Sequence, residues 1–214
     1  MSTITIALTK GRLEEKTARL LARAGFDMTP LEQKERRLII PLSDGLKIVL
    51  AKAADVVTYV ERGACDLGIV GKDTIAERGG SFFELMDLGF GKCRFAVAST
   101  KGKTLYNGYQ AVRIATKYPN ITRRYFEQKC IPIEIIKIEG SVELTPLIGL
   151  ADAIVDIVET GETLRANGLE IIEEIMPISA RVIANTTSLK LKREQIEELL
   201  KKMEAASAAD RETR

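Results

Sequence analysis

Histidine is absent from all 214 residues of the sequence. This absence excludes Ser-His-Asp and Cys-His nucleophiles in their usual forms and removes the commonest transition-metal ligand. Any catalysis must therefore use carboxylates, Lys, Arg, hydroxyls, backbone amides or a hard cation such as Mg²⁺.

Cysteine and long apolar runs are also scarce. Cys65, Cys93 and Cys130 are an odd number without CxxC spacing, which argues against a disulfide framework or a zinc site and indicates a reducing compartment. No apolar run approaches the length of a membrane span, and the N-terminus enters a strand pattern without a signal peptide, so we expect a cytoplasmic protein. The net charge of +2 provides no basic field for bulk nucleic-acid binding.

What is present is an alternation of strand and helix patterns, which predicts an α/β fold with mostly parallel sheets. The chain is long enough for two lobes, and the most favourable crossings between them lie at residues 89–93 and 178–181. Ligands of such sheets bind where strands end in loops. The predicted strands are 3–8, 38–41, 46–51, 66–70, 83–88, 94–99, 112–116, 133–138, 153–158, 169–176 and 181–185, and the helices are 13–24, 55–61, 71–77, 120–128, 142–148, 163–167 and 192–206.

The segment at residues 156–164 carries the sharpest chemical signal. A buried strand ends at acidic residues, Asp156 and Glu159, and a Thr-Gly-x-Thr turn leads into a helix. Outward backbone amides, Gly161 and the hydroxyls of Thr160 and Thr163 suit a phosphate, while the carboxylates could accept from ribose hydroxyls or hold hydrated Mg²⁺. The alternative is a plain helix cap made by one of the threonines, with a glutamate in the first turn.

Two basic segments are candidates for binding an anion. Lys10 and Arg12 flank a glycine after the first strand, which suits a pyrophosphate. Arg36 and Arg37 precede a strand and would point to opposite faces if it had already begun, so that one of them could face a ligand. A solvated loop is the alternative for both segments.

Two further turns could bind a ligand. In residues 66–73, Gly68 lies inside a predicted strand, which indicates that another part of the chain approaches its backbone closely. Gly71 and Asp73 open the helix that follows, and Asp73 could cap it. In residues 139–146, Glu139 follows a strand and Ser141 occupies the predicted N-cap of a helix. The N-terminus of this helix could also bind an anion. In each case a purely structural role is the alternative.

Together these segments resemble ATP phosphoribosyltransferases. The matching strings are TKGRL (9–13), DVVTYVERGACDLGIVGKD (55–73), RIATKY (113–118), EGSVE (139–143) and GLADAIVDIVETGETLRANGL (149–169). The resemblance implies two α/β lobes with mixed, mostly parallel sheets, similar to type II periplasmic binding proteins, with the active site in the cleft between them. Lobe I would comprise residues 1–90 and 180–214, and lobe II residues 91–179.

The resemblance also implies roles for individual residues. The turn of Glu159, Thr160, Gly161, Glu162 and Thr163 would hold the 5′-phosphate of phosphoribosyl pyrophosphate, with Asp156 close by. The cations Lys10, Arg12 and Arg36 match positions near the pyrophosphate and ATP, and we expect them to stabilise the leaving group. Further substrate contacts are expected at Lys52, Gly71, Asp73, Glu139 and Ser141. Lys52 stands where many members have Arg, and Val57 where a Pro is common; the metal ligands are not predicted.

The implied reaction joins ATP to 5-phosphoribosyl 1-pyrophosphate, giving N1-(5-phosphoribosyl)-ATP and pyrophosphate at the first step of histidine biosynthesis, with Mg²⁺. The chain resembles the short form, which lacks a C-terminal regulatory domain and works with a regulatory subunit related to histidyl-tRNA synthetase; a homodimer of catalytic subunits is also expected. Two alternatives stay open, a solute-binding protein without chemistry and a phosphoribosyltransferase for another acceptor.

Overall fold

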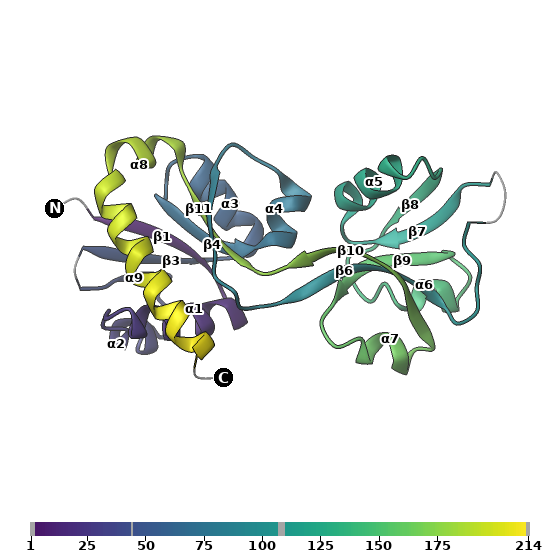
Figure 1. Ribbon diagram of the computed structural model, residues 1–214, viewed down its shortest axis with the longest axis horizontal. Coiled ribbons are helices and arrows are strands. Elements are labelled where there is room, and N and C mark those ends of the chain that lie inside the picture. The colour runs from purple at the N-terminus through teal and green to yellow at the C-terminus, as the bar shows by residue number, and fades with distance from the viewer. Residues whose placement is uncertain (1–2, 44, 107–109, 213–214) are drawn as a thin grey trace. The chain divides into compact units, whose positions relative to one another are not determined.

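The computed structural model describes residues 3–43, 45–106 and 110–212, which form two compact units, Met1–Gly91 with Ser179–Arg214 and Lys92–Ile178 (Figure 1). Unit 1 contains a six-stranded sheet in the order β2-β3-β1-β4-β11-β5. Its strands are β1 (Ile4–Thr9), β2 (Ile39–Pro41), β3 (Leu46–Ala51), β4 (Leu67–Gly71), β5 (Phe83–Asp87) and β11 (Ala180–Ala184), and its helices α1 (Arg12–Arg23), α2 (Thr29–Glu32), α3 (Ala53–Glu61), α4 (Lys72–Arg78), α8 (Thr186–Leu191) and α9 (Arg193–Glu212).

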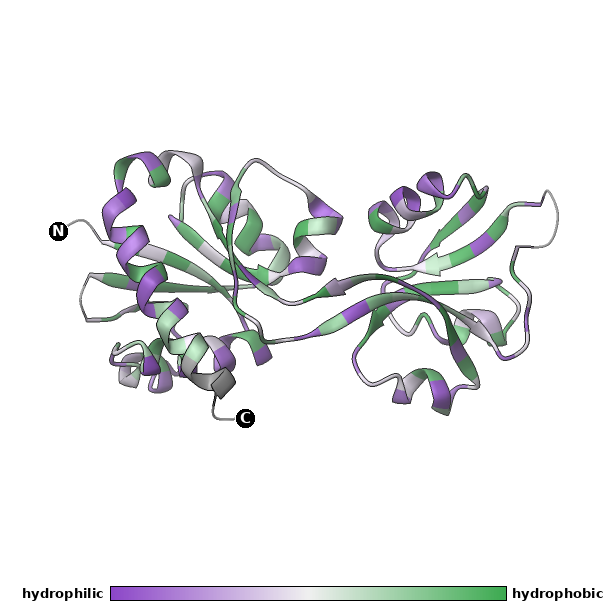
Figure 2. Ribbon diagram, viewed as in Figure 1, coloured by the Kyte–Doolittle hydropathy of each residue, from purple (hydrophilic) through white to green (hydrophobic). Residues whose placement is uncertain are grey.

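Alternation along β1 explains why helices cover both faces of this sheet. Ile4, Ile6 and Leu8 pack in one apolar cluster with α1 and α9, whereas Ala7 packs in another with α3 and α4. Successive side chains of a strand point to opposite faces, so a strand that is buried on both faces, as β1 is, needs a cover on each. In Figure 2 the apolar colour accordingly follows the strands, and hydrophilic colour marks the outer turns of α9.

Unit 2 contains a five-stranded sheet in the order β10-β6-β9-β7-β8. Val142, in the turn before α6, and Leu164 of α7 belong to the apolar cluster on one face, and α5 buries Ile121 and Phe126. Its strands are β6 (Cys93–Thr100), β7 (Val112–Thr116), β8 (Ile133–Lys137), β9 (Ala153–Val158) and β10 (Leu169–Ile178), and its helices α5 (Pro119–Gln128), α6 (Leu144–Leu147) and α7 (Glu162–Ala166).

The predicted α/β class with mixed sheets is confirmed, because β1 pairs in parallel with β3 and β4, and β7 with β8 and β9, while β2, β5, β6, β10 and β11 pair antiparallel. The expectation that the sheets are mostly parallel is wrong for the described strands, since four pairs are parallel and five are antiparallel. The close approach at Gly68 is also confirmed, since an added Cβ would lie 2.7 Å from a side-chain carbon of Val60 on α3. None of the helices in the described part of the chain combines the length and apolarity needed to cross a bilayer.

Several local predictions are wrong. Two short helices, α2 and α8, are absent from the predicted elements. The strand after Arg36 begins only at Ile39, so Arg36 and Arg37 lie in a turn and do not alternate across a sheet. The last helix continues to Glu212, six residues beyond its predicted end at residue 206. The predicted turn between β2 and β3 includes Asp44, which lies outside the described residues.

Two predicted helix caps are wrong for physical reasons. Gly71, not Asp73, is the N-cap of α4, and Asp73 lies in its first turn. Glu143, not Ser141, is the N-cap of α6, because the amide and hydroxyl of Thr145 both donate to the carbonyl of Val142 and close a separate turn first.

Candidate active site

The turn at residues 159–163 links β9 to α7, and we call it the β9–α7 turn. Gly161 is the N-cap of α7 with φ 76°, a left-handed conformation that glycine adopts without strain. No side chain caps the helix, although the hydroxyl of Thr160 accepts from the amide of Glu162 at 3.3 Å. The first N–H groups of a helix have no intrahelical acceptor, so this turn presents amide donors to a ligand.

A pocket of about 230 Å³ opens at this turn, lined by Glu143 and by residues 156–164. A single bound water needs about 10–15 Å³ of such space, so the pocket has room for a group much larger than water. It brings together six of the predicted residues, Asp156, Glu159, Thr160, Gly161, Glu162 and Thr163. Glu143, the N-cap of α6, also lines the pocket, and the sequence pattern does not predict it as a site residue.

The carboxyl of Asp156 is a perturbed titratable group of this pocket. Burial raises the pKa of Asp156 above its ordinary value, and the neighbouring carboxylate of Glu143 raises it further, while Lys117 acts in the opposite direction. A backbone hydrogen bond from Ile157 also lowers the pKa. Two carboxylates that influence one another beside a polar turn are well placed to accept hydrogen bonds from sugar hydroxyls.

Topology explains why the pocket forms here. Strands β7 and β9 are parallel neighbours, yet the helices that follow them cover opposite faces, since α7 packs in a cluster that α5 does not enter. Ligands of open α/β sheets bind at such switch points. Glu139 and Ser141 follow β8 at the same carboxyl edge but do not line the pocket, and Glu139 pairs with Lys137 at 2.9 Å.

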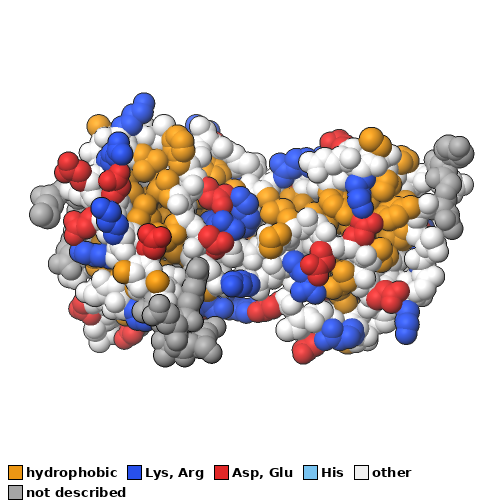
Figure 3. Space-filling view, viewed as in Figure 1, with side chains coloured by type: hydrophobic (Ala, Val, Ile, Leu, Met, Phe, Trp, Pro, Cys, Tyr) orange, Lys and Arg blue, Asp and Glu red, His pale blue; other side chains and the backbone are white. Residues whose placement is uncertain are grey.

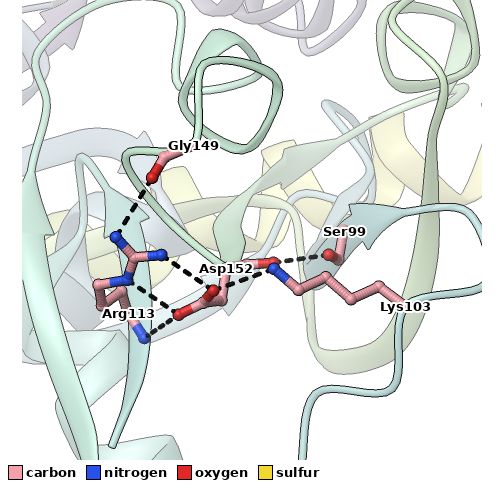
Figure 4. Close-up of polar contacts among 5 residues, drawn as sticks. All are labelled: Ser99, Lys103, Arg113, Gly149 and Asp152. Atoms are coloured by element: carbon pink, nitrogen blue, oxygen red, sulfur yellow. Dashed lines mark hydrogen bonds and ion pairs between the residues drawn. The ribbon is translucent and has the colours of Figure 1, made fainter.

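An ion network fixes the opposite, amino edge of this sheet (Figure 4). The carboxylate of Asp152 accepts from the backbone N, Nε and Nη2 of Arg113 at 3.0–3.1 Å and from Lys103 Nζ at 3.0 Å. Arg113 Nη1 also donates to the carbonyl of Gly149, and Ser99 to that of Asp152. The network therefore anchors the start of β9 and the connection from α6, the two elements that supply the pocket walls.

In unit 1, the predicted cations Lys10, Arg12, Arg36 and Lys52 lie at the carboxyl edge of the six-stranded sheet. The amide of Lys10 donates to the carbonyl of Ala51, directly before Lys52, and Thr9 Oγ1 donates to the carbonyl of Ile69 on β4. Strand β2 is antiparallel to β3 and starts at this edge, so Arg36 lies there too. Here β1 and β4 form a switch point, because α1 and α4 cover opposite faces.

Neighbouring acids hold the backbone at this edge. Gly11 has φ 85°, and its amide donates to Glu14, which is also ion-paired with Lys34. Arg12 follows as the first residue of α1. At the end of β4, an added Cβ on Gly71 would lie 2.0 Å from an oxygen of Asp73, so the carboxylate of Asp73 folds over the glycine. Glu14 and Lys34 were not predicted as neighbours of the site, since they are 20 residues apart.

The sequence model of the family described as "HisG: ATP phosphoribosyltransferase" matches residues 52–205. The chain belongs to the ATP phosphoribosyltransferase family. It is 52% identical over 202 residues to an ATP phosphoribosyltransferase of Clostridium kluyveri, covering 94% of this chain and 92% of that protein. Over 199 residues it is 53% identical to an ATP phosphoribosyltransferase of Clostridium botulinum, covering 92% and 94% of the two chains.

Solved structures agree with this family. The chain resembles the ATP phosphoribosyl transferase (HisG:HisZ) complex from Thermotoga maritima with a TM-score of 0.83 and 36% identity, over 97% of this chain and 100% of that one. It also resembles the periplasmic aliphatic sulphonate binding protein SsuA of Escherichia coli with a TM-score of 0.61 and 12% identity, over 100% and 75% of the chains, which shows the fold alone. The expected type II periplasmic-binding-protein-like fold is thereby confirmed.

The reaction of this family is the transfer of a phosphoribosyl group to ATP, the first step of L-histidine biosynthesis. The chain is accordingly a pentosyltransferase that condenses ATP with 5-phosphoribosyl 1-pyrophosphate and releases pyrophosphate. The prediction from the sequence is confirmed for the family, the fold class and the reaction.

Proposed function

We propose that the chain performs this reaction by holding the 5′-phosphate of phosphoribosyl pyrophosphate in the β9–α7 turn and neutralising the departing pyrophosphate with Lys10, Arg12 and Arg36. The observation that carries the proposal is the pocket at the carboxyl edge of β9, with its left-handed glycine and uncapped helix start. Asp156 then accepts from the ribose hydroxyls. Lys52, Gly71, Asp73, Glu139 and Ser141 provide further substrate contacts.

The chemistry needs charge stabilisation more than proton transfer. An adenine ring nitrogen of ATP attacks the anomeric carbon, and the bond from that carbon to the pyrophosphate oxygen breaks with oxocarbenium character. The attacking nitrogen carries no proton, so no general base is required, in keeping with a chain that lacks histidine. Cations aimed at the leaving pyrophosphate stabilise the charge that develops on it.

Magnesium fits this site as an ion that arrives with the substrate. No cluster of three or more His, Cys, Asp or Glu able to hold a metal exists among the residues the structure describes. Mg²⁺ usually keeps several waters and is held by substrate phosphates with one or two carboxylates. The pocket carboxylates Glu143 and Asp156 meet that smaller requirement. When bound, the ion supplies charge neutralisation to the pyrophosphate.

The phosphate assignment is tested by Thr163→Ala, with Thr187→Ala on α8 as the matched control. Loss of one hydroxyl donor corresponds to about 0.5–1.5 kcal/mol, or roughly a 2–10-fold higher KM for phosphoribosyl pyrophosphate. The KM for ATP should change little. An unchanged KM for phosphoribosyl pyrophosphate in Thr163→Ala would contradict the assignment.

The leaving-group assignment is tested by Arg12→Ala and Arg36→Ala, with Arg19→Ala on the exposed face of α1 as the control. Removing one donor to a developing charge costs on the order of 10²–10³ in turnover. We expect kcat to fall by that factor in the two test variants, with a smaller change in phosphoribosyl pyrophosphate binding. Steady-state kinetics with unchanged kcat would refute the role.

We also propose that the chain works with a separate regulatory subunit, because its structural neighbour from Thermotoga maritima is a HisG:HisZ complex. The assay mixes ATP, phosphoribosyl pyrophosphate, Mg²⁺ and the chain, follows the absorbance of the adenine adduct, and is repeated with that subunit. Faster turnover in the mixture, together with co-elution, is the expected result. Product only with another acceptor, or ligand binding without product, would favour one of the two alternative functions.

A further inference from the structure

The pocket at the β9–α7 turn has a charge composition that does not match its anionic substrate. Four of its lining residues are acidic, Glu143, Asp156, Glu159 and Glu162, and none is Lys or Arg. Carboxylates at short range repel a phosphorylated sugar, and the repulsion is strong where burial lowers the effective dielectric constant. A cation close to the pocket would offset this repulsion.

Three cations lie at the turn or at the carboxyl edge of its sheet, and two of them are engaged. Arg165 donates to the carbonyl of Thr160 at 3.1 Å, and Lys137 pairs with Glu139 at 2.9 Å. Lys117 is exposed, and its ammonium makes no hydrogen bond or ion pair within the described residues. Lys117 therefore keeps its donors available for a ligand.

Strand register places Lys117 beside Asp156. Ala115 on β7 pairs with Ile154 on β9 in parallel, and both belong to the apolar cluster that α6 and α7 cover. Side chains two residues further along a strand return to the same face. By this alternation Asp156 lies on the face that carries the pocket. Lys117 is the residue directly after β7, and Thr116 before it pairs with Val155, so Lys117 and Asp156 are neighbours at the switch point between β7 and β9.

Electrostatic effects agree with this placement. Burial is the main cause of the raised pKa of Asp156, and Lys117 opposes that rise. The pKa of Glu139 is lowered chiefly by its hydrogen bond from Lys137 and also by Lys117. The ammonium is therefore close enough to act on carboxyls that follow or lie in β8 and β9.

We propose that Lys117 is a further substrate-binding residue, a cation that attracts the phosphorylated sugar to the otherwise acidic pocket of unit 2. The inference rests on the proposed role of the β9–α7 turn and adds a residue to it. An ammonium is a point charge with three donors, suited to the changing geometry of a flexible polyanion.

The test is a charge series at this position in the full chain, Lys117→Arg, Lys117→Met and Lys117→Glu. Lys101→Met is the matched control, because Lys101 is an exposed lysine that follows β6 at the opposite edge of the same sheet. We expect Lys117→Met to raise the KM for phosphoribosyl pyrophosphate roughly 10-fold, the effect of losing one charged hydrogen bond. Lys117→Glu should raise it further and Lys117→Arg should restore it, while kcat and the KM for ATP stay within about two-fold.

Salt dependence provides a second measurement that a merely structural role would not change. The wild-type KM for phosphoribosyl pyrophosphate should rise with ionic strength, and the rise should be shallower in Lys117→Met. A KM in Lys117→Met equal to that of Lys101→Met would overturn the inference. If Thr163→Ala still weakened phosphoribosyl pyrophosphate in that case, the proposed site would stand and only Lys117 would be excluded; if neither variant had an effect, both would fall.

Discussion

Asp152→Asn tests the ion network at the amino edge of the unit 2 sheet. Its carboxylate accepts four hydrogen bonds, three from Arg113 and one from Lys103, and its side chain is only 26% exposed. Asparagine is nearly the same size, but it removes the charge and turns an amide donor towards two cations. The variant therefore tests the network without creating a cavity.

The magnitude follows from the hydrogen bonds and their exposure. A hydrogen bond to a charged group contributes about 1.5–3 kcal/mol net. Arg113 and Lys103 are 41% and 40% exposed, so water replaces part of what they lose. We expect the free energy of unfolding to fall by about 2–3 kcal/mol, measured by urea denaturation at pH 7. At roughly 2–4 °C per kcal/mol, the melting temperature should fall by about 4–12 °C.

Acid should abolish the difference between wild type and variant. The hydrogen bonds from Arg113 and Lys103 hold the pKa of Asp152 below its ordinary value of 3.8. A carboxyl with a lowered folded-state pKa stabilises the fold fully above its unfolded value, and this stabilisation disappears as the pH falls through the folded-state pKa. The difference should thus be constant between about pH 5 and 7 and shrink below about pH 4.

Glu197→Gln is the matched control, because Glu197 pairs with Arg193 along α9 and both are exposed. An exposed surface pair of this kind contributes little to stability, so this variant should lose much less stability than Asp152→Asn. If Asp152→Asn cost no more than this control, or if its effect persisted unchanged into acid, the network would not stabilise unit 2 as argued.

Three further substitutions test packing and backbone geometry. Gly68→Ala should cost about 1–3 kcal/mol in urea denaturation because its methyl group would overlap α3, whereas Gly140→Ala, with open space around it, should be neutral; equal values would refute the overlap. Gly161→Ala should strain the left-handed turn by about 1–2 kcal/mol and raise the KM for phosphoribosyl pyrophosphate, so unchanged kinetics would refute its role. Asp66→Asn should cost about 3–5 kcal/mol, because the carboxylate accepts from Lys192, Ser188 and the amide of Thr5; a thermal melt like that of wild type would contradict this.

Buried strands were the most predictable elements of the fold. The bounds of β7 and β9 match the prediction to the residue, because each is a short apolar run that ends at a polar turn. Helix α8 was missed since the sequence Asn-Thr-Thr-Ser resembles a loop. Its signal was Asn185, whose side chain caps the helix by accepting from the amides of Thr187 and Ser188.

Site residues were predictable where one continuous segment builds the site. The six pocket residues between positions 156 and 163 come from one strand and the turn after it, so spacing alone could group them. Glu143 and Lys117 reach the same region through strand order and helix packing. Sheet order is a long-range property, and a single sequence does not fix which strand ends lie side by side.

The pairing of Cys93 with Ile178 across β6 and β10 has a consequence for how the chain could be cut and rejoined. Directly opposite residues of an antiparallel pair have Cα atoms about 4.5–5.5 Å apart, so Lys92–Ile178 begins and ends at nearly one point. In unit 1, the amide of Ala180 donates to the carbonyl of Phe90, so the two ends of unit 1 that flank the insertion are adjacent as well. Unit 2 is thus organised as an insertion in unit 1, and in each unit the two chain ends at the crossing lie close enough for a short glycine link to join them.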